Sequence, residues 1–221
     1  MKRYVALLMS LILAFTLTAC GVSRVPTNEQ PQEETNNIPQ QAEEESPNAG
    51  DNSTLDGQAN SEGKILIAFF SRSGNTEQLA EQISKQTNGT LFEIIPEEPY
   101  PDDYDATVER FRKERDEDAR PAIASSVEDM SSYDTIFVGF PIWGGDMPHV
   151  VRTFLEEYDL SGKTVVPFCT HGGSGFAAST ATLASLCPDA SVLDGFEISG
   201  SRVENCADGV SDWLNRIGII G

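Results

Sequence analysis

Basic residues are scarce in this 221-residue chain. It has 15 Lys and Arg against 35 Asp and Glu, and only two His, so its formal net charge at pH 7 is −20. Nucleic-acid binding depends on basic side chains that neutralise phosphates, so we expect no nucleic acid among the partners. The acidity is typical of a well-solvated protein, and it is also compatible with attraction of a basic partner.

Cysteine is rare as well. The four cysteines, Cys20, Cys169, Cys187 and Cys206, contain no Cys-x-x-Cys spacing. That absence excludes the usual zinc-site and dithiol redox motifs. The acidic pairs and triplets between residues 97 and 118 lack the spacing of metal ligands, so we expect no metal site. Cys187 and Cys206 are expected at opposite edges of a sheet, too far apart for a disulfide.

The apolar run from Val5 to Leu17 is too short for a stable membrane span. It follows Lys2 and Arg3 and precedes small residues and Cys20, a pattern that predicts a targeting segment. The pattern resembles a bacterial lipoprotein signal, in which residues 1–19 are removed and Cys20 becomes the lipid-modified first residue. An ordinary secretory signal or an uncleaved anchor is the alternative. Each of these places the chain outside the cytoplasm.

Large apolar residues are almost absent from residues 20–63, where Gln, Asn, Glu, Pro and Ser predominate. This segment cannot bury enough surface to offset the entropy of ordering, so we predict a disordered acidic tether after the lipidated cysteine. Residues 64–221 hold 26 acidic and 12 basic residues, a net charge of −14. Their length suits one domain with its own core.

Within this domain, apolar segments alternate with amphipathic ones. We expect strands at residues 64–70, 90–95, 133–140, 163–169 and 191–198. Helices are expected from 75 to about 87, from 104 to 117, from 148 to 158, up to 186, and from about 203 to 217. The first strand lacks alternation between apolar and polar residues, so it should be buried on both faces. The order predicts an α/β fold with a parallel sheet and right-handed crossovers.

Three loops that follow strands are rich in small or aromatic residues. After the first strand, Ser71, Ser73 and Thr76 supply hydroxyls, Gly74 permits a tight turn, and a helix begins near Asn75. The free N–H groups of a helix start bind anions. Because the carboxyl ends of parallel strands meet at one edge, we expect a ligand site there.

His149, at the start of another helix, is expected at the surface.

The three loops together resemble those of the flavodoxin family. The run Ile67–Thr76 is similar to the flavodoxin signature, and Pro141–Gly144 and Thr170–Gly175 resemble the second and third FMN loops. The resemblance implies a flavodoxin-like three-layer sandwich with a five-stranded parallel sheet in the order 2-1-3-4-5. It also implies FMN as the cofactor, bound by Ser71, Arg72, Ser73, Gly74, Asn75, Thr76, Pro141, Ile142, Trp143, Gly144, Thr170, His171, Gly172, Gly173 and Gly175.

In this interpretation the phosphate lies on residues 71–76, and the flavin ring lies between Trp143 and the loop 170–175. The protein needs no catalytic residue of its own. Gly144 stands where relatives often carry a second tryptophan. Either this change weakens FMN binding, or the loop follows a Trp-Gly-Asp pattern that is shifted by one and uses Asp146. Trp143 either contacts the flavin or caps the core, and His171 either touches the flavin or bonds to a loop carbonyl.

The leading hypothesis is an FMN-binding electron-transfer flavoprotein, anchored outside the cytoplasm by a lipid. We expect a monomer that meets redox protein partners at the membrane. One alternative is an NAD(P)H-dependent quinone or flavin reductase that uses the same cofactor. Another is a cofactor-free binding lipoprotein with the same fold, because fold alone does not determine function.

Overall fold

The computed structural model describes residues 63–221. The predicted signal, the lipidation of Cys20 and the tether fall on residues 1–62 and lie outside the described residues. Within residues 63–221, no helix combines the length and the apolar character that crossing a bilayer requires.

Parallel strands form the centre of the domain. They are β1 (Lys64–Phe69), β2 (Thr90–Glu93), β3 (Tyr133–Pro141), β4 (Thr164–His171), β5 (Ser191–Val192) and β6 (Phe196–Ser199). The order in the sheet is β2-β1-β3-β4-β5, with β6 also paired to β4, and every pairing is parallel. The predicted fold class and strand order are therefore confirmed.

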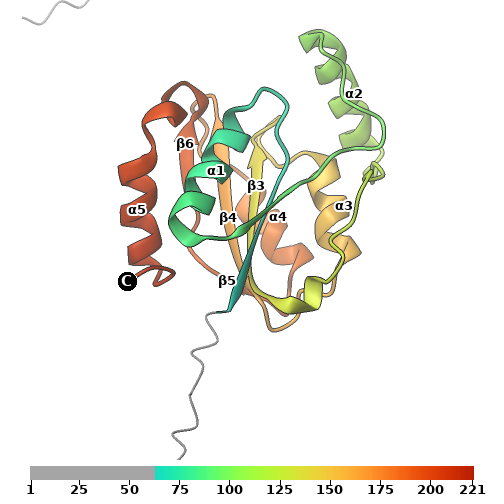
Figure 1. Ribbon diagram of the computed structural model, residues 1–221. Helices are drawn as coiled ribbons and strands as arrows, with labels where there is room; N and C mark the ends of the chain where they lie inside the picture. The colour runs from blue at the N-terminus through green and yellow to red at the C-terminus, as the bar shows by residue number, and fades with distance from the viewer. Residues whose placement is uncertain (1–62) are drawn as a thin grey trace, which may run out of the picture. The chain divides into compact units, whose positions relative to one another are not determined.

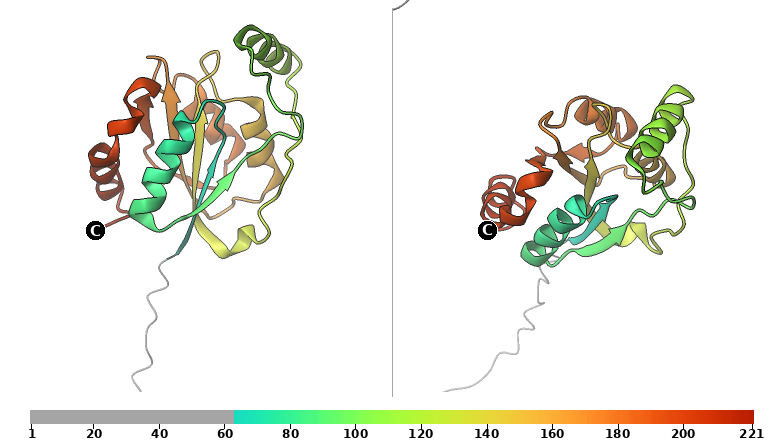
Figure 2. Two further views of the ribbon diagram at one scale, coloured as in Figure 1. Left: turned by 45° about the horizontal axis from the view of Figure 1, so that its top comes forward. Right: turned by 90° about the horizontal axis from the view of Figure 1, so that it is seen from above.

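Helices cover both faces of the sheet. Their bounds are α1 (Asn75–Thr87), α2 (Tyr104–Asp116), α3 (His149–Glu157), α4 (Ser179–Leu186) and α5 (Ala207–Arg216), with short 3-10 turns η1 (Met130–Ser132) and η2 (Gly200–Asn205). Helices α1 and α5 lie on one face, and α3 and α4 on the other (Figure 1). Helix α2 projects at the upper edge, outside the two layers (Figure 2). It is therefore placed beside the loops that follow the strands.

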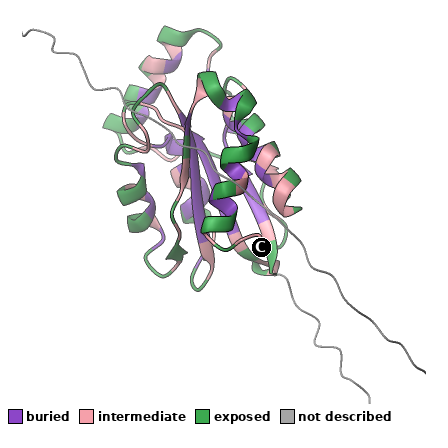
Figure 3. Cartoon of the chain, turned by 90° about the vertical axis from the view of Figure 1, so that its left-hand side faces the viewer, coloured by how far each residue is buried: buried purple, intermediate pink, exposed green. Residues whose placement is uncertain are grey.

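The core consists of two apolar clusters, one on each face of the sheet. In β1, Leu66 and Ala68 point to the α3 and α4 side, and Ile67 and Phe69 point to the α1 and α5 side. All four are at most 4% exposed. Figure 3 shows the strands as the buried centre between helices with exposed outer faces. Burial of β1 on both faces, which its unbroken apolar run predicts, is confirmed.

The fifth position in the sheet differs from expectation, because two short strands replace one continuous strand. Between the pairs Val165–Val192 and Phe168–Phe196, the outer strand contains one residue more than β4. Pro167 of β4 lies in this interval and has no N–H to donate to a neighbouring strand. Gly195 passes so close to the Pro167 carbonyl that an added Cβ would lie 2.7 Å from its oxygen. The outer strand bulges there and then resumes as β6.

Two further details differ from the sequence-based prediction. The last α-helix begins at Ala207 rather than near Val203, because η2 precedes it. His149 is buried, not exposed, and its Nδ1 lies 2.9 Å from the Ala119 carbonyl oxygen. The three described cysteines are buried and free, with Cys187 in one core cluster and Cys206 in the other. No disulfide links them.

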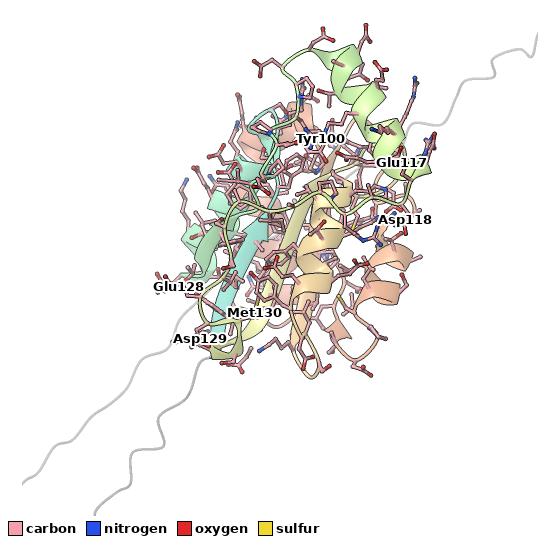
Figure 4. The ribbon with its side chains drawn as sticks, turned by 90° about the vertical axis from the view of Figure 1, so that its right-hand side faces the viewer. Tyr100, Glu117, Asp118, Glu128, Asp129 and Met130 are labelled. Carbon is pink, nitrogen blue, oxygen red and sulfur yellow. The ribbon has the colours of Figure 1, made fainter. Side chains whose placement is uncertain are left out.

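A long connection joins α2 to β3. From Glu117 to Met130 it runs from the end of α2 to the opposite edge of the domain (Figure 4). It pairs with the segment after β2 through an antiparallel bridge between Pro96 and Ile123. Arg120 pairs with Glu156 of α3 at 2.6 Å and with Asp118 at 2.8 Å. These contacts fasten the carboxyl end of α2 to α3.

Candidate functional site

The three predicted loops meet at the carboxyl edge of the sheet. We call residues 71–76 loop 1, residues 141–146 loop 2 and residues 170–175 loop 3. A cavity of about 470 Å³ lies between them, with Ser73 and Asn75 from loop 1, Pro141, Ile142 and Trp143 from loop 2, and Thr170, His171 and Gly172 from loop 3. A larger depression of about 720 Å³ lies at the other edge of the sheet and contains none of the predicted site residues.

A fourth segment also lines the cavity. Ser199, Gly200 and Ser201, where β6 passes into η2, belong to its wall. An added Cβ at Gly200 would lie 2.7 Å from the side-chain amide nitrogen of Asn75. This segment was not predicted from the sequence. Its signal was the run Ser-Gly-Ser at the end of the fifth strand, the same kind of small-residue loop that follows strands one, three and four.

Loop 1 presents unpaired donors at the start of α1. Gly74 has φ +84, a conformation that glycine adopts freely, and no side chain caps the helix start. The structure contains no acceptor from the described residues for the backbone N–H groups of residues 71–77. Ser71 and Ser73 add hydroxyls beside them. Such a cluster of N–H groups and hydroxyls at a helix N-terminus suits a phosphate without a cationic side chain.

Arg72 turns away from this cluster of donors. Its guanidinium Nη2 donates to the Pro101 carbonyl oxygen at 3.0 Å, and the same nitrogen also contacts the Asp102 carbonyl. Arg72 is among the residues expected to bind FMN, but its side chain lies against the loop before α2 and not over the helix start.

Thr76 and Thr170 link loop 1 to loop 3. Thr76 is only 1% exposed, and its Oγ1 shares a hydrogen bond of 2.9 Å with Thr170 Oγ1. The Ile142 N–H donates to the Thr170 carbonyl oxygen at 2.9 Å and so attaches loop 2 to the same residue. The three loops are therefore fixed relative to one another by contacts between their own residues.

Loop 2 makes a tight turn through two glycines. Gly144 and Gly145 have φ +57 and φ +85, and Trp143 and Asp146 exchange backbone hydrogen bonds across them. The Asp146 carboxylate accepts from the Met147 N–H at 2.8 Å, from Arg152 at 2.7 Å and from the Thr182 hydroxyl at 2.8 Å. Asp146 therefore holds the loop to α3 and α4 through three hydrogen bonds.

Trp143 contacts three aromatic rings and also lines the cavity. Phe70, Tyr100 and Phe111 meet it nearly at right angles, with centroid distances of 5.5, 5.0 and 5.9 Å. Edge-to-face contacts of this kind fix a ring's orientation as well as bury it. Trp143 packs against the core, as one of the two roles considered for it requires, and it also lines the cavity, where contact with a flavin stays a prediction.

The missing second tryptophan has a structural counterpart. A Cβ added at Gly144 would lie 2.6 Å from Cε1 of Phe111, a buried residue of α2. The space beside residue 144 is therefore filled by the Phe111 ring. An aromatic side chain borders loop 2 at this point, although α2 supplies it.

A hydrogen-bond network of Tyr100, Glu114 and Arg110 holds the Tyr100 ring against Trp143. The Tyr100 hydroxyl donates to Glu114 at 2.7 Å, and Arg110 donates to the other carboxylate oxygen at 2.8 Å (Tyr100 is labelled in Figure 4). The Arg110 guanidinium lies 4.2 Å from the centre of the Tyr100 ring. Burial and, to a smaller extent, the hydrogen bond to Glu114 raise the pKa of Tyr100 well above its usual range. Tyr100 is therefore a neutral donor and a fixed support for Trp143.

In loop 3, His171 connects the backbone to β6. Its Nδ1 accepts a hydrogen bond from the Gly173 N–H at 2.8 Å, and its Nε2 lies against the Glu197 carboxylate. Because Nδ1 is an acceptor, the neutral ring carries its proton on Nε2. The expected bond to a loop carbonyl is replaced by one from a loop amide, while His171 also lines the cavity. Nearby, burial and the charge of Glu197 raise the pKa of Cys169, so this thiol is neutral.

The site has the features of a nucleotide-binding α/β protein with a phosphate loop. A family model described as Flavodoxin matches residues 64–217, and the chain belongs to the flavodoxin family. FMN, the cofactor expected from the three loops, is the cofactor of that family. No group of three or more His, Cys, Asp or Glu suited to a metal occurs in the described part of the chain.

Solved structures and a curated relative agree with this assignment. A crystal structure of a Bacteroides eggerthii protein is 35% identical, with a TM-score of 0.64, over 71% of this chain and 98% of that one. A flavoprotein from Lactobacillus acidophilus in complex with FMN has the same fold, with 24% identity, a TM-score of 0.56 and coverage of 64% and 97%. The Bacillus subtilis protein named probable flavodoxin 2 is 32% identical over 119 residues, 52% of this chain and 62% of its own length.

Proposed function

We propose that this chain binds FMN noncovalently between loops 1, 2 and 3 and carries electrons. The observation that carries the proposal is the meeting of the three loops, joined at Thr170, around one cavity. Flavin, when bound, accepts and releases electrons, and the protein supplies binding, orientation and electrostatics. FMN in the Lactobacillus acidophilus complex, a protein of the same fold, gives further support.

Different loops would bind different parts of FMN. The free N–H groups of loop 1, with the hydroxyls of Ser71 and Ser73, would hold the phosphate. Trp143 and Ile142 would form one wall for the ring, and Thr170, His171 and Gly172 would face it from loop 3. The net charge of −14 on residues 64–221 disfavours the addition of electrons, so we expect a low reduction potential.

The first 63 residues would determine where the protein is located and which partners it meets. Residues 1–19 would be a lipoprotein signal, Cys20 the lipidated first residue, residues 21–63 an acidic tether, and residues 64–221 the flavin domain. A lipid anchor and a long tether would let a monomeric domain reach redox proteins at an extracytoplasmic membrane surface. The arrangement of Lys2, Arg3, the apolar run and Cys20 supports this part of the proposal.

An FMN titration of the purified protein, followed by absorbance and flavin fluorescence, tests the cofactor. We expect saturation at one FMN per chain, with quenched fluorescence. Riboflavin, which lacks the phosphate, should bind far more weakly. Ser71→Ala and Ser73→Ala should reduce the difference in affinity between FMN and riboflavin. Ser185→Ala, on α4 away from the loops, should leave this difference unchanged. Protein that stays colourless with FMN would favour the cofactor-free alternative.

A reductase is the second candidate, because loop 3 leaves the cavity open. Gly172 and Gly173 have nothing within 4 Å of where a Cβ would stand, so no aromatic side chain covers the site there. A nicotinamide or quinone could approach a bound flavin by this route. Stopped-flow mixing with NADH and NADPH separates the two functions, since rapid loss of flavin absorbance supports the reductase and its absence supports the carrier.

A further inference from the structure

A second cavity, of about 350 Å³, lies between α2 and the first two loops. On the helix side it is lined by Tyr104, Thr107, Val108, Phe111, Arg112 and Arg115. The spacings of three and four residues place these side chains on one face of α2. Arg72, Trp143 and Gly144 lie across from them, with Ile142. We call this cavity the arginine groove, and it shares Ile142 and Trp143 with the candidate FMN cavity.

The charge of the arginine groove is opposite to that of the domain. Three of the domain's 12 basic residues line it, and no Asp or Glu among the described residues does so. Arg72 is held by the carbonyl oxygens of residues 101 and 102, not by a carboxylate. Among residues 63–221, Arg115 pairs only with its exposed neighbour Asp116, a type of pair that contributes little in water. Arg112 pairs with no acid in the described part of the chain.

Helix electrostatics explain only part of this arrangement. Arg115 and Lys113 lie in the last turn of α2, where basic residues interact favourably with the helix dipole. That effect does not explain Arg72, which comes from loop 1, or why Arg112 and Arg115 face Arg72 across a hollow. Like charges brought together without acids repel one another unless an anion accompanies them.

The walls between the arginines are aromatic and apolar. The rings of Trp143 and Phe111 border the groove with Val108, and Tyr104 is 72% exposed at its rim. Guanidinium groups bind carboxylate, sulfonate and phosphate oxygens in pairs and also stack on flat rings. The volume is that of a small-ligand pocket.

We propose that the arginine groove binds a small planar aromatic molecule that carries an anionic group. The ring would pack against Trp143 and Phe111, and the anion would meet Arg112 and Arg115. This site adjoins the FMN cavity and shares Ile142 and Trp143 with it, but neither Arg112 nor Arg115 belongs to the residues assigned to FMN. FMN titration tests the proposed function, and titration with an aromatic anion tests the groove through Arg112 and Arg115. Failure of one experiment therefore does not decide the other.

Isothermal titration of the purified protein with anthraquinone-2-sulfonate tests the proposal, with neutral 2-(hydroxymethyl)anthraquinone as the matched probe. The sulfonate should bind at one site, more weakly as salt rises. Arg112→Gln and Arg115→Gln should each weaken it by about three- to tenfold. Lys113→Gln removes the same charge from the same helix outside the groove and should change the affinity less than twofold.

Three results would overturn the inference. These are no binding of the sulfonate, equal binding of the neutral probe, or equal effects of Lys113→Gln and Arg112→Gln. Circular dichroism and FMN titration of each variant show whether the fold and the cofactor site are intact. A variant that unfolds is replaced by Arg112→Lys, for which a smaller loss of affinity than for Arg112→Gln is expected.

Discussion

Thr76 and Thr170, 94 positions apart in the chain, share a buried hydrogen bond of 2.9 Å between their hydroxyl oxygens. The carbonyl of Thr170 also accepts the N–H of Ile142. Thr170 therefore contacts both other loops of the candidate site through hydrogen bonds. Its role is to set the spacing between the phosphate-binding turn and the walls for the flavin ring.

Replacement of Thr170 by Val should destabilise the domain by about 1–3 kcal/mol, because the Thr76 hydroxyl is left buried without a partner. Urea denaturation measures the loss. The double variant Thr76→Val/Thr170→Val should cost less than the sum of the single changes, since it removes both polar groups. If the stability loss of the double variant equals the sum of the losses of the two single variants, the two hydroxyls do not interact.

Gly144→Ala should be more damaging than Gly145→Ala. Both glycines have positive φ, which costs an alanine about 1 kcal/mol. Only at Gly144 would the new Cβ also meet the Phe111 ring, while the space beside Gly145 is open. The difference between the two thermal unfolding midpoints reports this clash. Equal midpoints would mean that Phe111 does not occupy the space beside loop 2.

The link between α2 and α3 should weaken in acid. Hydrogen bonds from Arg120 lower the pKa values of Asp118 and Glu156 in the folded state. A lowered folded pKa gives stability that is present above the unfolded pKa and lost as pH falls through the folded value. Arg120→Gln should therefore reduce stability at pH 7, with a difference from wild type that shrinks as pH falls below the ordinary carboxyl pKa of about 4. Arg216→Gln, on α5, is the control and should not show this profile.

The cysteines of the domain should be unreactive in the native state. Burial raises the pKa of Cys169, of Cys187 to about 11 and of Cys206, so little thiolate exists at pH 8. Iodoacetamide should label none of the three in folded protein and all three in urea, as counted by mass spectrometry. Labelling of Cys169 without denaturant would contradict the closed core around β4.

Cys20 should differ from these three, because we expect it to carry lipid. Protein purified from membranes of a bacterial host with lipoprotein processing should begin at Cys20, with the added mass of acyl chains on its first residue. A mature chain that begins at another residue, or an unmodified Cys20, would support the ordinary secretory signal instead. Membrane fractionation of the same sample should place the lipidated form in the pellet.

Local patterns were sufficient for much of the fold and for the place of the site. The unbroken apolar run of β1 predicted burial on both faces, and the small-residue loops after β1, β3 and β4 predicted the edge where the cavity lies. Both depend on neighbours in the sequence. The interruption between β5 and β6 was missed because it depends on how Gly195 meets Pro167 of another strand.

The surroundings of Trp143 could not be predicted for the same reason. Phe70, Tyr100 and Phe111 come from three separate segments, and only the folded chain brings their rings to one indole. The place of His149 at a helix start predicted a surface position, yet the connection after α2 covers it at Ala119. Roles that depend on contacts between distant segments become visible only in three dimensions.

Because the Phe111 ring fills the space beside Gly144, loop 2 and α2 can be replaced by the segments of a related protein only together. A chimera that takes the loop of a two-tryptophan relative but keeps this α2 would place two rings in the same space. One that takes both segments would avoid the collision. Related chains should therefore vary at positions 111 and 144 together, with a large side chain at one of them and a small one at the other.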